Sequence, residues 1–148
     1  MSELMWIRSH VERLLQDEWG TAQIVADEDG DYPYREGTAA CWVSVMATEP
    51  VMVRVFAHAA IGLKSSLKLL SELNAIQWRA LSASISLRGG IAVVEQTISP
   101  INLTGPVLGQ AMRAVGGVAD DIGMLLAGMF NGSTPYPATE QPTTEDAA

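Results

Sequence analysis

Two neighbouring segments with alternating apolar and polar residues constrain the fold of this chain most. Residues 39–47 and 51–58 are rich in β-branched and aromatic residues, and Glu49-Pro50 separates them. A third segment of this kind, 32–36, follows an acidic, glycine-containing stretch that begins at Asp27. The pattern predicts three consecutive strands joined by tight connections.

The remaining periodic segments complete one α+β domain. Helical spacing is found before the strands and twice after them, and a further pair of alternating segments flanks Gly89-Gly90, a two-residue hairpin turn. The predicted helices cover 3–19, 63–76 and 105–130, and the added strands cover 81–88 and 91–98. The order α-β-β-β-α-β-β-α predicts one antiparallel sheet with helices mainly on one face.

A change in composition divides the chain into a domain and a tail. The 148 residues are enough for one domain with a substantial core. The stretch that follows the last helix has three prolines, few apolar residues and no periodicity. We therefore expect a folded domain over 1–132 and a disordered polar tail over 133–148.

Charge and cysteine content exclude several functional classes. Acids outnumber bases by 17 to 9, and the formal charge is −8, so nucleic acid and an anionic membrane surface are not expected partners. Charged residues interrupt every long apolar run, so we expect neither a signal peptide nor a membrane span. Cys41 is the only cysteine; it is expected to be a packed thiol in a cytoplasmic protein.

The residue types that carry chemistry are too scattered for a catalytic or metal site. The acids from Asp27 onward fail the spacing of a calcium loop, and His10, His58 and Cys41 fall in separate elements. The adjacent pair Asp120-Asp121 diverges on a helix and is expected to solvate its outer side. The sequence therefore predicts a protein that is not an enzyme and that needs no metal or cofactor.

Two helices carry more apolar surface than one core contact requires. In the middle helix, Leu63, Leu67 and Leu70 lie on one side, and Leu69, Leu73 and Ile76 lie roughly opposite. One side can face the sheet and the other a second subunit, and we predict Leu69, Leu73 and Ile76 as a dimer interface. In the last helix, Gly109, Gly116 and Gly123 align. Either the chain itself or a helix of another subunit packs closely against them.

The strands predict one further apolar surface. Val51, Val53 and Val55 share one face of the third strand, which leaves Met52 and Phe56 on the other. The neighbouring strand adds Trp42 and Met46 there in one register, or Cys41, Val43 and Val45 in the alternative register. Aromatic residues and methionine are typical of contact sites. The predicted partner-binding residues are Trp6, Trp42, Met46, Met52 and Phe56, unless a helix or loop covers them.

With this order of elements, the chain resembles the YbjN and type III secretion chaperone-like family, and most of all its actinobacterial, peptide-binding branch. The resemblance covers most of 3–132. It rests on Asp29-Gly-Asp-Tyr-Pro-Tyr, on Ser71-Glu-Leu-Asn74, on the Gly-Gly hairpin before Ile91-Ala-Val-Val, and on Ala119-Asp-Asp121 with Met129-Phe-Asn-Gly132. It implies a small acidic dimer that holds a segment of a client polypeptide.

Two functions are compatible with these observations. The first is a non-catalytic, chaperone-like protein that binds a peptide or amphipathic segment of a client, as a homodimer or paired with a homologous chain. The second is a small-molecule sensor or regulatory subunit with a pocket between sheet and helices. The first predicts a broad apolar surface, whereas the second predicts one deep cavity with converging polar groups.

Overall fold

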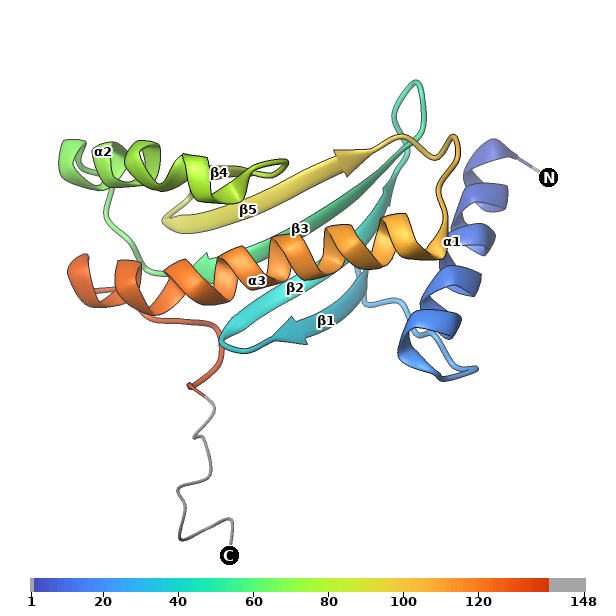
Figure 1. The fold of residues 1–148 in the computed structure, drawn as a ribbon, viewed down its shortest axis with the longest axis horizontal. Helices are drawn as coiled ribbons and strands as arrows, with labels where there is room; N and C mark the ends of the chain where they lie inside the picture. Colours follow the sequence, from blue (N-terminus) through green and yellow to red (C-terminus); the bar gives the residue numbers. More distant parts are fainter. Residues whose placement is uncertain (1, 139–148) are drawn as a thin grey trace, which may run out of the picture.

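The computed structural model describes residues 2–138, which form one antiparallel sheet with helices against one face (Figure 1). The elements are α1 (Glu3–Trp19), β1 (Tyr32–Glu36), β2 (Ala39–Met46), β3 (Met52–Ala60), α2 (Leu67–Ile76), the 3-10 helix η1 (Gln77–Ala80), β4 (Ser84–Arg88), β5 (Ile91–Ile98) and α3 (Gly105–Met129). The strands are arranged in the order β1-β2-β3-β5-β4. This confirms the predicted α+β class and order of elements.

The register of β2 and β3 divides the sheet into two faces. Val43 is paired with Val55, and both are fully buried beneath the helices. Trp42 is paired with Phe56 and points the other way, since successive residues of a strand alternate. We call the second surface the outer face; its strand residues are Pro33, Arg35, Ala40, Trp42, Ser44, Met46, Met52, Arg54, Phe56, His58, Ser84, Ser86, Arg88, Ile91, Val93, Glu95 and Thr97.

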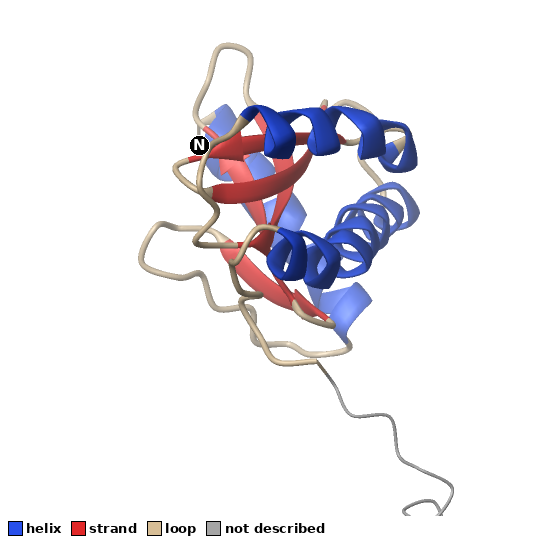
Figure 2. Ribbon diagram, turned by 90° about the vertical axis from the view of Figure 1, so that its left-hand side faces the viewer, coloured by secondary structure: helices blue, strands red, loops and turns tan. Residues whose placement is uncertain are grey.

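The aligned glycines let α3 lie directly on the inner face of the sheet. Figure 2 shows α2 and α3 on the same side of the strands. A Cβ at Gly116 would lie 2.8 Å from the Cβ of Glu36, and one at Gly123 would collide with the carbonyl oxygen of Ala59. The close packing is therefore within one chain, as the first of the two predicted alternatives has it.

Helix α1 closes one end of the core. The Ser2 hydroxyl accepts a hydrogen bond from the Met5 backbone N–H, and Gly20 ends the helix in the left-handed conformation with φ of 63°. Ile7, Val11 and Leu15 are buried on its inner side, where α1 packs against α3 and β2. The predicted bounds of this helix agree with the structure.

The segment between β3 and β5 differs from the prediction at two boundaries. Helix α2 begins at Leu67, because Ser66 caps it with a hydrogen bond from the Leu69 N–H. The fourth strand begins at Ser84 rather than at 81, because 77–80 form η1 and Leu81 takes a left-handed φ of 48°. Alternation at 81–83 therefore did not indicate a strand.

The turn between β1 and β2 is held by a helix side chain. Asp120 Oδ1 accepts hydrogen bonds from the Thr38 backbone N–H and hydroxyl, at 2.8 and 3.0 Å. Gly37 has φ of 55° and approaches the same carboxylate so closely that a Cβ would collide with it. The expectation that Asp120 is solvated was wrong. Its exposed neighbour Asp121 forms only a 3.7 Å ion pair with Arg79.

The chain continues along the domain beyond the predicted boundary after 132. Ser133 and Ile61 exchange two backbone hydrogen bonds, and the Tyr136 N–H donates to the Thr38 carbonyl. The Arg35 guanidinium lies 4.3 Å from the centre of the Tyr136 ring. Residues up to 138 are thus held by β1 and its neighbours. The rest of the predicted tail, 139–148, lies outside the described residues.

Candidate interaction surface

The outer face carries a cluster of aromatic side chains at its centre. The Trp42 and Phe56 rings stack with centroids 5.1 Å apart, and the His58 ring lies 4.6 Å from that of Trp42. This follows from the register, because directly paired residues on one face lie within reach of each other. The cluster brings together rings from two strands.

Two methionines extend this cluster to the end of the hairpin. Met46 is paired with Met52, so both flank the connection between β2 and β3 on the outer face. All four of these predicted residues, Trp42, Met46, Met52 and Phe56, are half-buried. Methionine side chains adapt to irregular partner surfaces, and aromatic rings anchor a bound partner. The structure therefore selects the first of the two predicted registers.

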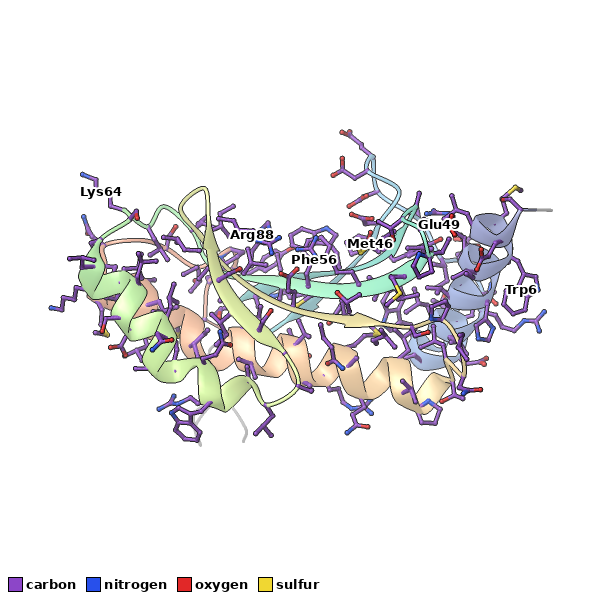
Figure 3. The ribbon with its side chains drawn as sticks, turned by 90° about the horizontal axis from the view of Figure 1, so that it is seen from above. Trp6, Met46, Glu49, Phe56, Lys64 and Arg88 are labelled. Carbon is purple, nitrogen blue, oxygen red and sulfur yellow. The ribbon has the colours of Figure 1, made fainter. Side chains whose placement is uncertain are left out.

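In residues 2–138, no helix packs on the outer face. Figure 3 shows Phe56, Met46 and Arg88 on the side of the sheet that points away from α2 and α3. An antiparallel sheet can leave one face to solvent, but that face is then usually polar. Here its centre is aromatic and aliphatic, which is typical of a contact surface.

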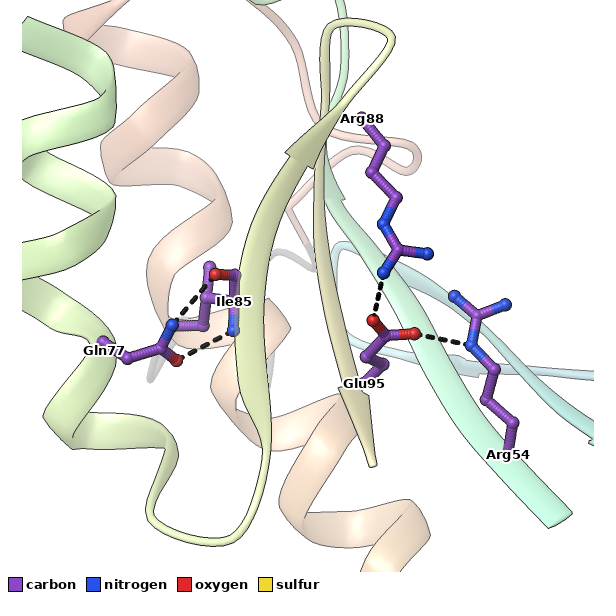
Figure 4. Close-up of polar contacts among 5 residues, drawn as sticks. All are labelled: Arg54, Gln77, Ile85, Arg88 and Glu95. Atoms are coloured by element: carbon purple, nitrogen blue, oxygen red, sulfur yellow. Dashed lines mark hydrogen bonds and ion pairs between the residues drawn. The ribbon is translucent and has the colours of Figure 1, made fainter. Parts of the chain in front are cut away.

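A charged group borders the aromatic cluster. The Glu95 carboxylate accepts hydrogen bonds from Arg54 Nε, at 2.6 Å, and from Arg88 Nη2 (Figure 4). The Arg54 guanidinium also lies 4.2 Å from the centre of the Phe56 ring. A hollow of about 420 Å³ lies beside this group and is lined by Met46, Ser84 and Thr97 together with the charged residues.

The titratable histidine of this surface is held neutral. Burial lowers the pKa of His58 below its usual value of 6.5, and the nearby positive charge of Arg54 lowers it further. Its folded-state pKa lies below the unfolded value, so protonation of His58 favours the unfolded chain at acid pH. At neutral pH the ring acts as an uncharged aromatic group beside Trp42.

Trp6 lies apart from the other four predicted partner-binding residues. It is on α1, 60 % exposed, and stacks on His10 with centroids 5.7 Å apart. The Nε2 atom of His10 is hydrogen-bonded to the Leu103 carbonyl oxygen at 2.8 Å. The structure therefore brings together four of the five residues on one surface and leaves Trp6 on another.

The two sides of α2 are used in the opposite way from the prediction. Leu69, Leu73 and Ile76, which we predicted as a dimer interface, are buried in the core of the monomer. Their burial removes them from contact with a second subunit. The side that remains exposed carries other apolar residues, which continue into η1 and the turn after it: Leu67, Leu70, Trp78 and Leu81.

The thiol of Cys41 and the acidic loop have structural roles. Burial raises the pKa of the Cys41 thiol to about 12, so it is protonated at neutral pH. Asp27 Oδ1 accepts hydrogen bonds from the backbone N–H groups of Asp29 and Asp31, which closes the acidic turn. Among residues 2–138, no group of three His, Cys, Asp or Glu side chains is placed to hold a metal ion.

Sequence reasoning missed the Arg54, Glu95 and Arg88 group. Glu95 reaches Arg54 only because β5 lies beside β3, a neighbour relation that the order of elements does not specify. Arg88 and Glu95 are seven residues apart across the Gly89-Gly90 hairpin, and this spacing was the one available signal.

Solved structures that are similar to this fold include two complexes. The crystal structure of the ExsC-ExsE complex contains a chain 18% identical, with a TM-score of 0.61 over 80% of this chain and 95% of that one. The HopA1-SchA chaperone-effector complex contains a chain 13% identical, with a TM-score of 0.60 over 82% and 97%. Both likenesses show a shared fold.

In residues 2–138, none of the helices has the length and hydropathy to cross a membrane.

Two further comparisons concern the sequence. A search of curated proteins finds no match. The family model TY-Chap1, described as "T3SS (YopN, CesT) and YbjN peptide-binding chaperone 1", matches residues 5–138. The chain therefore belongs to this family of peptide-binding chaperones, as its sequence resemblance predicted.

Proposed function

We propose that this protein is a non-catalytic, chaperone-like protein that holds a peptide or amphipathic segment of a client polypeptide on its outer face. The observation that carries the proposal is the aromatic and methionine surface of Trp42, Phe56, Met46 and Met52, on which no helix of the described chain packs. Membership in a family of peptide-binding chaperones supports the same function.

The two edges of the sheet favour binding on the face over strand addition. At the β4 edge, the Gln77 side chain donates to the Ile85 carbonyl and accepts from the Ile85 N–H, at 2.9 and 2.8 Å (Figure 4). At the other edge, β1 contains Pro33, which has no N–H to donate. Both features weaken an edge as a template for an added strand.

We further propose that the protein pairs with a second copy or with a homologous chain through the exposed side of α2 and η1. Leu67, Leu70 and Trp78 present apolar surface there, with exposed fractions of 87%, 46% and 72%. Leu70→Asp should convert a dimer into a monomer in sedimentation velocity experiments. Ile101→Asp, at a residue that is also exposed, is the control and should leave the dimer intact.

The client is tested by affinity capture from the native host, followed by co-expression of the captured polypeptide. We expect one polypeptide at stoichiometric amounts with the unchanged protein and with Ile101→Asp, and its loss with Phe56→Asp. Circular dichroism must show that Phe56→Asp is folded. Equal recovery by the folded Phe56→Asp protein would contradict binding on the outer face.

The alternative function, a small-molecule sensor, requires a pocket between the sheet and the helices. A hollow of about 250 Å³ lies between α3 and the end of β5 and is lined by Ser82, Gln96, Val107, Gln110, Ala111 and Ala114. Ligand pockets usually have volumes of about 300–1,000 Å³ and enclose most of the ligand. A metabolite that raises the melting temperature equally in the unchanged protein and in Phe56→Asp would favour this alternative.

A cytoplasmic location is proposed on the free, buried thiol of Cys41.

A further inference from the structure

The outer face differs in charge from the rest of the molecule. Its strand residues include Arg35, Arg54 and Arg88 against one acid, Glu95, which gives a net charge of +2. The chain as a whole has a formal charge of −8, so the remaining residues together carry −10. The strand residues of this face therefore favour an anionic group more than the remaining residues taken together do.

The positive charge is concentrated beside the aromatic cluster. Glu95 is shared by two arginines, so one carboxylate is set against two guanidinium groups. Each guanidinium has five N–H donors, and the hydrogen bonds to Glu95 use one donor of Arg54 and one of Arg88. The Arg88 side chain is 57% exposed, and it can therefore donate to a further group from solvent.

The geometry joins this anion-attracting group to the apolar surface. Phe56 is paired with Glu95 across β3 and β5, and with Trp42 across β2 and β3, so the three side chains form one row. The hollow of about 420 Å³ opens at the end of this row and is lined by Arg54, Arg88 and the hydroxyl-bearing Ser84 and Thr97. Guanidinium and hydroxyl groups there can all donate to a carboxylate.

We propose that the preferred ligand of the outer face is an acidic peptide segment. An aromatic or aliphatic side chain packs on Trp42 and Phe56, and a neighbouring Asp or Glu side chain lies against Arg88 and Arg54. The argument is charge complementarity, and it rests on the proposed function of this face. The net charge of −10 on the remaining residues disfavours the same segment there.

The test is a selection of random, phage-displayed linear peptides on the immobilised full chain at low salt. We expect enriched peptides to combine an aromatic or aliphatic residue with a nearby Asp or Glu. Synthetic versions of the best peptide, with Asp or Glu replaced by Asn or Gln, should bind about two- to fivefold more weakly, as for one exposed charge pair. This difference should vanish at high salt.

Three variants assign the preference to this group of side chains. Arg88→Gln should lower affinity for the acidic peptide about two- to fivefold, and Glu95→Gln should raise it, because one negative charge leaves the group. Arg113→Gln is the matched control: it removes an exposed arginine that pairs with Glu18 on the opposite side of the sheet. It should leave affinity unchanged.

The outcomes separate this inference from the proposed function. Enrichment of apolar peptides without acids, or equal effects of Arg88→Gln and Arg113→Gln, would overturn the acidic preference alone. Enriched peptides that bind Phe56→Asp as well as the unchanged protein, or no enrichment at all, would overturn peptide binding on the outer face itself.

Discussion

The inner and outer faces of one sheet follow opposite rules. Val55 and Phe56 are adjacent in β3, yet Val55 is fully buried against α3 while Phe56 is half-exposed on the outer face. The inner face is uniformly small and apolar at its centre, as close packing of a helix requires. The outer face is aromatic, sulphur-containing and positively charged. Large apolar residues are thus placed where no helix of residues 2–138 needs them for the core, and the proposed function assigns them to a partner.

The largest expected effect comes from placing one charge on each face at adjacent positions. Val55→Asp buries an unpaired carboxylate beneath α3 and should lower the free energy of unfolding by about 4 kcal/mol or more. Phe56→Asp places the same charge where water can reach it, and should cost about 1 kcal/mol while abolishing client binding. Urea denaturation followed by fluorescence measures the free energy of unfolding of both variants. Similar losses of stability in the two variants would break the distinction between the faces.

A smaller effect tests how closely the inner face is packed. Gly116→Ala brings a Cβ to within 2.8 Å of the Glu36 Cβ and should destabilise the protein by about 1–3 kcal/mol. Gly117 is its matched control in the same helix, because within the described chain a Cβ there meets nothing within 4 Å. Gly117→Ala should stabilise by up to about 1 kcal/mol. Thermal unfolding should therefore shift in opposite directions for the two variants.

Adjacent residues also predict a difference in chemical reactivity. Cys41 faces inward and its pKa is raised to about 12, mainly by burial, whereas Trp42 faces outward. We expect the native thiol to resist alkylation at pH 8 and to react on unfolding. Because the folded pKa exceeds the unfolded one, the stability from the neutral thiol is complete below pH 9 and is lost as pH rises towards 12. Rapid alkylation of the folded protein would contradict this placement.

Local patterns in the sequence predicted the two faces of the sheet but not every contact. Strand alternation separated Val53 and Val55 from Met52 and Phe56, because the pleat alone decides which side each residue takes. The same logic failed for α2, whose sides are both apolar, so periodicity could not say that Leu69 faces the core. Helical periodicity also failed to predict the hydrogen bonds of Asp120, because they depend on Thr38 in a distant turn. Contacts of this kind depend on tertiary packing, which single-sequence patterns do not encode.

The smallest expected effect concerns Trp6, which composition alone would group with Trp42. Trp6 stacks on His10 on α1 and is exposed, and it contributes nothing to the row of Trp42, Phe56 and Glu95. Trp6→Ala should change client affinity by less than about 0.5 kcal/mol, whereas Trp42→Ala should cost about 2 kcal/mol or more. Isothermal titration with the selected acidic peptide measures both. A loss with Trp6→Ala as large as with Trp42→Ala would extend the binding surface to α1, and the outer face would then be only part of it.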